Sequence, residues 1–254
     1  MTQGSRSALR RYAQVVRGYN DNGEGRHRAM YSEPFQIFDA VDDLVNASGS
    51  KVLSIQLPHT AQRFLNLSHE IMRSIRDVRH HPCTFFFGGT RPFQQYPTPQ
   101  IKMLSLVASM ITQLIELVPK TFEDTTDDEL SEQKFINLQL ACVNYGESPI
   151  SILGAIDIIK ALISVIPHHM IFFFAGCDRL TSMDGDEDPD LAWLLSYLLR
   201  CLVSSSKVSR VRKILWFNYG SSTPLNRVRQ EVISPQDYIT VTYPRDWNGG
   251  RKRI

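Results

Sequence analysis

The residues best placed to do chemistry stand at the ends of apolar runs. The run Ile171–Leu180, IFFFAGCDRL, leads through a glycine and a cysteine to a single Asp178. A carboxylate that follows a buried strand can bind a divalent cation or move a proton. His59 and Asp184 also follow apolar runs and could supply acid or base groups. These residue types allow acid–base or cation-binding chemistry at strand ends.

Other polar clusters have simpler interpretations. The pairs His80-His81 and His168-His169 each precede an apolar run. Adjacent residues of a strand point to opposite faces, so neither pair is well arranged for joint metal ligation, and we interpret both as polar strand edges. Arg210, Arg212 and Lys213 form a small basic cluster that could contact nucleic acid together with the basic termini. We interpret this cluster as surface charge.

The elements that must position these residues alternate along the chain. Five short apolar runs have the length and composition of buried strands. They are Lys51–Leu57, Cys83–Phe87, Met170–Phe174, Lys213–Phe217 and Tyr238–Thr242. Between them, apolar residues recur every three or four positions, which predicts helices around 64–75, 104–118, 152–166 and 191–203. Such alternation is typical of a parallel sheet with helices on both faces, whose ligands bind beyond the carboxyl ends of the strands.

The composition is that of a globular protein, with 254 residues and a hydrophobic fraction of 43%. A formal charge of +2 does not indicate a polyanion partner. We expect reduced, mostly buried thiols at Cys83, Cys142, Cys177 and Cys201, which are widely spaced. No apolar run reaches about 18 residues, and no signal core begins the chain, so we expect a cytoplasmic protein without a membrane span. An Arg-rich start free of acidic residues keeps a mitochondrial location as the alternative.

The order of motifs resembles one family. The most specific stretch is Cys83–Ile115, CTFFFGGTRPFQQYPTPQIKMLSLVASMITQLI, in which a phenylalanine strand leads through a polar loop to a Leu-rich helix. Upstream SEPFQIFDAVDDLVNASGSKVLSIQL and downstream KILWFNYGSSTPL and YITVTYPRD follow in the same order. The chain resembles the NACHT-type branch of the STAND P-loop NTPases, in particular the nephrocystin-like domains of filamentous fungi, over roughly Tyr31 to Tyr243.

This resemblance implies a fold and a domain plan. The fold is a three-layer, P-loop NTPase-like α/β fold with a central, mostly parallel five-stranded sheet flanked by helices. In that fold the first strand, Lys51–Leu57, lies beside the fourth and fifth. The plan has a basic segment at 1–30 that is either disordered or helical, a NACHT-like domain at 31–243 and a basic tail at 244–254.

The phosphate-binding turn of the family is degenerate here. A working turn needs glycines whose backbone amides wrap the phosphates, a lysine that reaches them, and a hydroxyl that binds magnesium. Aligned on Pro58, which matches the family proline, the lysine position holds Gln62 and the hydroxyl position holds Arg63. The glycine positions hold Gln56, His59 and Ala61. The resemblance therefore implies a turn without phosphate chemistry.

The other two motifs that the family uses for nucleotide hydrolysis have changed as well. In FAGCDRL, Ala175 stands at the magnesium carboxylate, Asp178 at the second acid and Arg179 at the glutamate position. An alanine cannot bind a divalent ion, and a guanidinium beside it opposes one. In LWFNYG, Tyr219 replaces the sensor arginine.

We therefore expect a catalytically silent domain that keeps the fold and acts as a binding, scaffold or signalling module, with no cofactor, no bound metal and no nucleotide. A protein partner or self-association fits this role, whereas a membrane or a nucleic acid does not. The alternative is an active enzyme that binds or hydrolyses nucleotide at a non-standard site, using Asp178, Asp184 or His59.

Overall fold

The structure is a computed structural model that describes residues 2–13, 35–57, 61–88, 98–124, 130–143, 149–177, 180–183, 186–203, 210–218, 222–231 and 233–242. The chain forms two compact units. The helical unit comprises Met1–Asn22, Arg91–His168 and Arg179–Leu202, and the sheet unit comprises Gly23–Thr90, His169–Asp178 and Val203–Ile254.

Five strands form the parallel sheet of the sheet unit. They are β2 (Lys51–Gln56), β3 (Cys83–Phe87), β5 (His169–Ala175), β8 (Val211–Asn218) and β9 (Tyr238–Thr242). Their order is β3-β5-β8-β2-β9, and every neighbouring pair is parallel. All five predicted strands are confirmed, with bounds that differ by at most two residues. The first predicted strand, β2, does lie between the fourth and the fifth.

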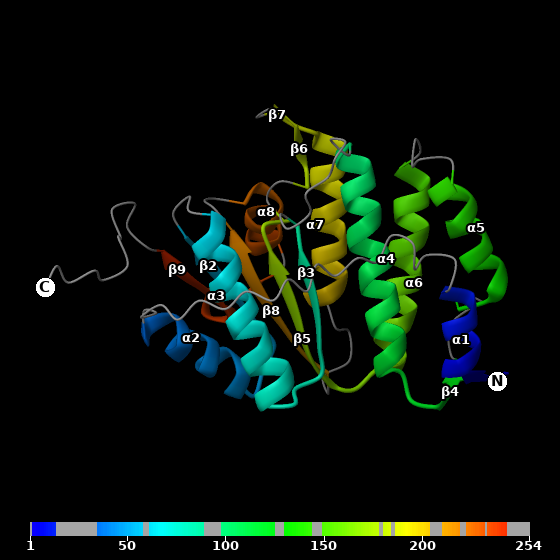
Figure 1. Ribbon diagram of the computed structural model, residues 1–254, viewed down its shortest axis with the longest axis horizontal. Helices are drawn as coiled ribbons and strands as arrows, with labels where there is room; N and C mark the ends of the chain where they lie inside the picture. Colours follow the sequence, from blue (N-terminus) through cyan, green and yellow to red (C-terminus); the bar gives the residue numbers. More distant parts are fainter. Residues whose placement is uncertain are drawn as a thin grey trace, which may run out of the picture. The chain divides into compact units, whose positions relative to one another are not determined.

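One face of this sheet is covered by helices α2 (Phe35–Asn46) and α3 (Ala61–Arg73), which Figure 1 shows lying against the strands. Apolar side chains of both helices, including Leu44, Phe64 and Ile71, share one core with Phe173 and Phe217 of the sheet. Helix α3 continues into a π-helical turn over Ser74–Val78, and α8 (Thr223–Glu231) follows β8. The expected α/β fold, with a mostly parallel five-stranded sheet and flanking helices, is confirmed.

The helical unit contains α1 (Arg6–Tyr12), α4 (Pro99–Leu117), α5 (Glu132–Val143), α6 (Pro149–Val165) and α7 (Pro189–Val203). Strand β1 (Thr2–Ser5) pairs antiparallel with β4 (Thr121–Asp124), and β6 (Ser182–Met183) pairs with β7 (Asp186–Glu187). Helix α7 has proline at its first position, and the Asp188 carboxylate accepts hydrogen bonds from the amides of Asp190 and Leu191 at 3.0 and 3.1 Å. This is the cap expected of a helix start.

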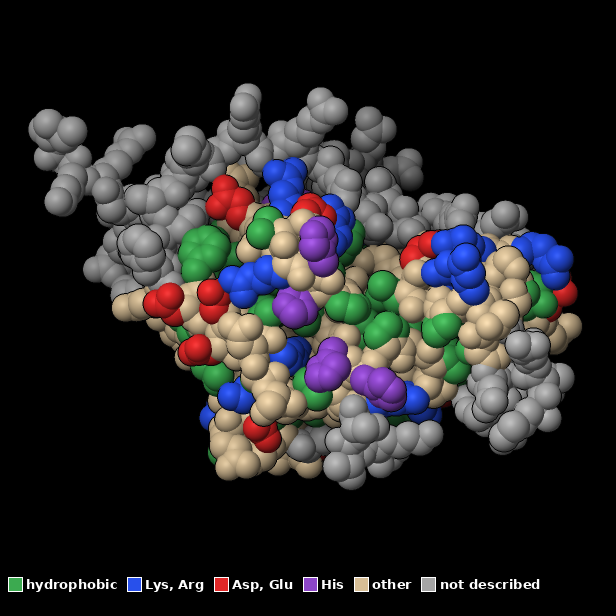
Figure 2. All heavy atoms as spheres, turned by 90° about the horizontal axis from the view of Figure 1, so that it is seen from below, with side chains coloured by type: hydrophobic (Ala, Val, Ile, Leu, Met, Phe, Trp, Pro, Cys, Tyr) green, Lys and Arg blue, Asp and Glu red, His purple; other side chains and the backbone are tan. Residues whose placement is uncertain are grey.

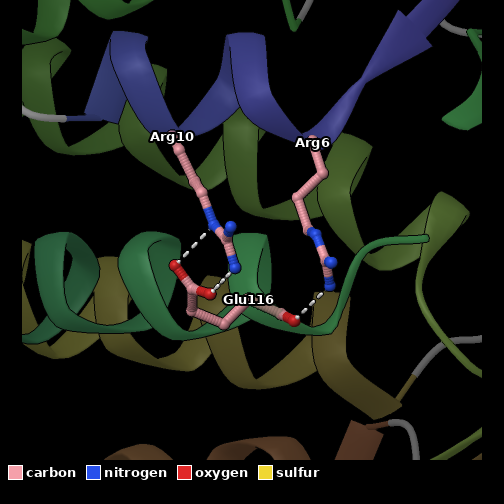
Figure 3. Close-up of polar contacts among 3 residues, drawn as sticks. All are labelled: Arg6, Arg10 and Glu116. Atoms are coloured by element: carbon pink, nitrogen blue, oxygen red, sulfur yellow. Dashed lines mark hydrogen bonds and ion pairs between the residues drawn. The ribbon is translucent and has the colours of Figure 1, made fainter. Parts of the chain in front are cut away.

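The N-terminal arginines bind the end of α4, as Figure 3 shows. The Arg10 guanidinium donates to both carboxylate oxygens of Glu116, with Nε 3.0 Å from Oε1. The hydrogen bond and the charge of Glu116 raise the pKa of Arg10. Arg6 donates to the Glu116 carbonyl oxygen at 3.2 Å. Two of the basic residues at the start of the chain therefore hold α1 beside α4.

Helix α4 is long and apolar enough to cross a membrane by length and composition alone, with a mean hydropathy of 1.2. The apolar residues of this helix do not form an unbroken run, because Lys102, Gln113 and Glu116 lie among them. In addition, 61% of the apolar window is buried inside the protein. Residues such as Met103, Leu106 and Ile111 are buried on several sides of α4, which is the pattern of a core helix.

The described cysteines are free thiols, as expected. Cys177 is buried, and Cys83 and Cys201 are half-buried. Burial raises the pKa of Cys83 to about 11, so this thiol stays protonated near neutral pH. The side chain of Cys142 lies outside the described residues.

Two residues of the predicted surface cluster are buried instead. Arg212 and Lys213 lie within β8 and are 2% and 5% exposed. Burial, followed by the charge of Arg210, lowers the pKa of Arg212 to about 10. The interpretation of these residues as surface charge was wrong. The predicted strand began only at Lys213, so its charged start was taken to be exposed, whereas the strand begins at Val211 and contains both residues.

Candidate functional site

The carboxyl ends of the parallel strands are the place where folds of this class bind ligands. Backbone hydrogen bonds continue the sheet past its assigned ends at this edge. The Leu57 amide donates to the Asn218 carbonyl at 3.1 Å, and the Gly176 amide donates to the Phe217 carbonyl at 2.9 Å. The tips of β2, β5 and β8 are therefore tied to one another by their main chains.

Ala175 ends β5 at the centre of this edge. It is 1% exposed and belongs to the same apolar core as α2 and α3. Its carbonyl oxygen accepts a hydrogen bond from the Gly88 amide at 2.7 Å. An alanine side chain offers no oxygen ligand, and the nearby backbone groups already bond within the sheet. A divalent cation would therefore find no carboxylate at this position.

Two glycines close the corner between β3 and β5. Gly176 adopts a φ of 70°, which favours glycine because a side chain would clash with the backbone. A Cβ atom at Gly88 would lie 2.6 Å from the carbonyl oxygen of Gly176. Each of these residues is a glycine for a local steric reason. The backbones of Gly88 and Gly176 therefore leave no room for a side chain between them.

Aromatic rings fill the core beneath the same edge. The imidazole of His69, on α3, stacks on Phe87 at the end of β3, with centroids 4.1 Å apart and planes 14° apart. His69 is 5% exposed. Phe87 in turn contacts Phe173, whose ring centroid lies 5.6 Å away. Helix α3 therefore packs against the end of β3 through the stacked rings of His69 and Phe87.

Helix α3 begins at Ala61, so Gln62 and Arg63 lie in its first turn, although their side chains lie outside the described residues. Six other predicted positions lie outside these residues altogether. They are Pro58, His59, Asp178, Arg179 and Tyr219 of the degenerate motifs, together with Asp184 of the alternative hypothesis. Of the predicted motif residues, the described part of the chain therefore places the side chains of Gln56 and Ala175.

The described tips carry no charge. Gln56 and Leu57 end β2, Ala175 ends β5 and Asn218 ends β8, and each of these side chains is neutral. Within the described ranges no group of three His, Cys, Asp or Glu residues could hold a metal ion. The described part of this edge can contact a ligand through neutral polar and apolar groups, and it supplies no counter-charge for a triphosphate.

Sequence reasoning did not identify His69, Gly88 or Asn218 as residues of this edge. Asn218 is fully buried and ends the apolar run of β8, and Gly88 directly follows the phenylalanines of β3. A polar residue or a glycine at the last position of a predicted central strand is the signal that could have found these two. His69 lies on the apolar face of a helix, and no feature of the sequence around it indicates that it reaches this edge.

A scan of the chain against protein-family models gave no match, and a search of curated proteins gave none either.

Proposed function

We propose that this chain is a catalytically silent, P-loop NTPase-like domain of the NACHT type that acts as a binding or scaffold module in signalling. The observation that carries the proposal is the tip of β5. Ala175 is buried there, and its carbonyl oxygen accepts a hydrogen bond from Gly88. A central strand that ends in this way lacks the carboxylate with which nucleotide hydrolases of this fold bind magnesium.

The strand order supports the proposal independently of the site. The resemblance placed the first strand between the fourth and the fifth, and β2 pairs with β8 on one side and with β9 on the other. That order follows from long-range pairing and cannot be inferred from any single motif. The strands on which we propose that the degenerate motifs lie end at one edge of the sheet, which is consistent with one former ligand site.

Nucleotide binding is the direct test of catalytic silence. We expect ATP or GTP with Mg²⁺ to leave the melting temperature of the protein unchanged. A ligand at about 100 times its Kd would stabilise the fold by about 2.7 kcal/mol. For a chain of this size, where each 1 kcal/mol shifts the melting temperature by about 2–4 °C, such a gain raises it by about 5–10 °C. A magnesium-dependent rise of that size, reproduced by isothermal titration, would contradict the proposal.

The helical unit carries a surface suited to a protein partner. Trp193 of α7 is 47% exposed and stacks on Tyr197 one turn later, with ring centroids 5.5 Å apart and planes 2° apart. The Lys160 amine of α6 lies 5.9 Å from the centroid of the Tyr197 ring. Tryptophan and tyrosine dominate the energies of protein interfaces. We call these three residues the aromatic patch and infer that they contact a protein.

A second copy of the chain is the first partner to test. We expect sedimentation velocity to show concentration-dependent association of the wild type, and Trp193→Ser to weaken it about thirtyfold or more, because a tryptophan that is an interface hot spot contributes at least about 2 kcal/mol. Ile136→Ser is the matched control, since Ile136 is an exposed apolar residue of α5 in the same unit. A wild type that stays monomeric throughout would contradict self-association through this patch.

A further inference from the structure

A cavity of about 360 Å³ opens at the amino ends of the strands, the edge opposite to the tips discussed above. Its apolar wall includes Val45 and Met170, and its polar lining includes Ser48, His81, His169 and Lys213. All lining residues belong to the sheet unit. The volume lies near the lower limit of ligand pockets, which run from roughly 300 to 1,000 Å³.

The parallel sheet brings these residues together. Strands β3, β5 and β8 are neighbours, and their first residues therefore share one edge. His81 comes just before β3, His169 begins β5 and Lys213 is the third residue of β8. Figure 2 views the molecule from this side and shows histidine side chains at the surface with basic side chains among them. Three strands thus contribute nitrogen-bearing groups to one cavity.

A left-handed turn sets the position of His81. His80 adopts a φ of 54°, which is uncommon for a residue with a side chain. The His81 amide then donates to the Ile75 carbonyl at 3.1 Å, and the Pro82 carbonyl accepts from the Ile171 amide at 3.0 Å. These bonds fix the segment between the π-helical turn and β3. The imidazole of His81 is half-buried, whereas His169 is exposed.

Lys213 provides a buried ammonium group at the base of the cavity. The residue is 5% exposed, and its amine donates to the Val45 carbonyl at the end of α2 at 2.6 Å. An ammonium has three donors, and this bond uses one of them. Burial, followed by the charge of Lys51, lowers the pKa of Lys213. Burial removes water from this ammonium. A bound anion would compensate for that loss by pairing with its charge.

The charges around the cavity share one sign. Burial lowers the pKa of His81, and the charges of Lys213, Arg79 and His169 lower it further. The nearby carboxylate of Asp42 is bound to Arg79 in an ion pair. No aspartate or glutamate is among the described residues that line the cavity. The groups facing His81 therefore form a positive site without a built-in anion.

We propose that this cavity binds a small, doubly charged oxyanion, of the class of a compact phosphate monoester, through Lys213, His81 and His169. The ammonium supplies the fixed charge, and the two imidazoles supply donors that hold the anion in one orientation. The hydroxyl of Ser48 lies on the same lining and can donate as well. The apolar wall limits the size of the group attached to the phosphate.

Binding depends on pH through the imidazoles. A folded-state pKa of His81 below its ordinary value of 6.5 means that the free protein loses stability as the pH falls below 6.5. An anion beside His81 favours the protonated imidazole and reverses this shift. The anion should therefore bind more tightly as the pH falls through this range. Sulfate is the better probe of this effect, because phosphate monoesters themselves gain a proton near pH 6.

The test is a titration of the full chain with sulfate and with inorganic phosphate, followed by the imidazole signals in NMR spectra and by calorimetry. We expect saturable changes in the imidazole signals of His81 and His169, an increase in the pKa of His81, and tighter sulfate binding at lower pH. His169→Ala should weaken binding about tenfold, because it removes a hydrogen bond to a charged group. Lys213→Met should weaken it at least as much.

His80→Asn is the matched control. It removes an exposed imidazole next to the cavity, and asparagine accepts a positive φ. If His80→Asn weakens binding as much as His169→Ala, binding depends only on the total positive charge near the cavity, and the proposal is wrong. It is also wrong if the wild type shows no saturation with either ion, or if a folded Lys213→Met variant binds as well as the wild type. Should Lys213→Met fail to fold, the His169→Ala comparison decides.

Discussion

We expect Ala175→Asp to lower the free energy of unfolding by about 3–5 kcal/mol, which is the usual cost of an uncompensated buried charge. Ala175 is 1% exposed and lies in the apolar core with Phe173 and Phe217. The described strand tips offer no cation to pair with a carboxylate. Restoring the acid that a magnesium site needs should therefore damage this fold. Urea unfolding followed by circular dichroism measures the loss.

Ala175→Asn separates the charge from the change in size. The asparagine side chain is neutral and has nearly the same size as that of aspartate. The Ala175→Asp variant should therefore be less stable than the Ala175→Asn variant at neutral pH. Burial raises the pKa of a carboxyl group, and the penalty of the aspartate is full above that raised pKa. The difference between the variants should therefore shrink as the pH falls toward about 4. If Mg²⁺ restores the stability of Ala175→Asp, a magnesium site exists and our proposal of a silent site is wrong.

The strands could be predicted from the sequence because each is a nearly unbroken apolar run. The run MIFFF of β5 can be buried on both faces only in a central strand, and the structure buries every residue from Met170 to Ala175. Only the place of the first strand beside the fourth and fifth came from the resemblance, and the rest of the strand order was not predicted. Helix α2 and the pairing of β1 with β4 were not predicted. Strand β1, TQGS, has no apolar pattern, so only its distant partner defines it.

The cavity could not be predicted, because Lys213, its buried cation, contradicts the rule that lysines lie at the surface. A lysine beside an arginine usually marks a surface, yet Lys213 is buried. Its amine satisfies the Val45 carbonyl at the end of α2, and only the packing of this helix on the sheet creates that requirement. One signal was available. Two histidine pairs directly precede two predicted parallel strands, and the amino ends of such strands meet at one edge whenever the strands are neighbours.

The two edges of the sheet therefore differ in chemistry. At the carboxyl edge, the described tips are neutral, Ala175 is buried, and the backbones of Gly88 and Gly176 pack closely together. At the amino edge, a cavity contains a buried ammonium and two imidazoles. The anion site that we propose therefore lies at the edge opposite to the one that nucleotide hydrolases use. The anion would then act on α2, whose last turn is bonded to Lys213.

The core that joins these edges depends on Phe173. We expect Phe173→Ala to lower the free energy of unfolding by about 3–5 kcal/mol, because it removes a buried ring and leaves a cavity. Phe173 is 1% exposed, and its ring centroid lies 5.6 Å from that of Phe87 and 5.3 Å from that of Phe217. These rings connect β3, β5 and β8 beneath α3. Urea unfolding measures the loss.

Phe86→Ala is the matched control for this substitution. Phe86 is a phenylalanine of the neighbouring strand β3, but it is half-buried, and β3 is an edge strand. Removing its ring should cost about 1 kcal/mol, near the centre of the range for single substitutions. Both variants lose the same ring, so the difference between their free energies of unfolding measures the effect of burial. Equal losses would mean that the core is not centred on β5, which would contradict the packing of α3 on this strand.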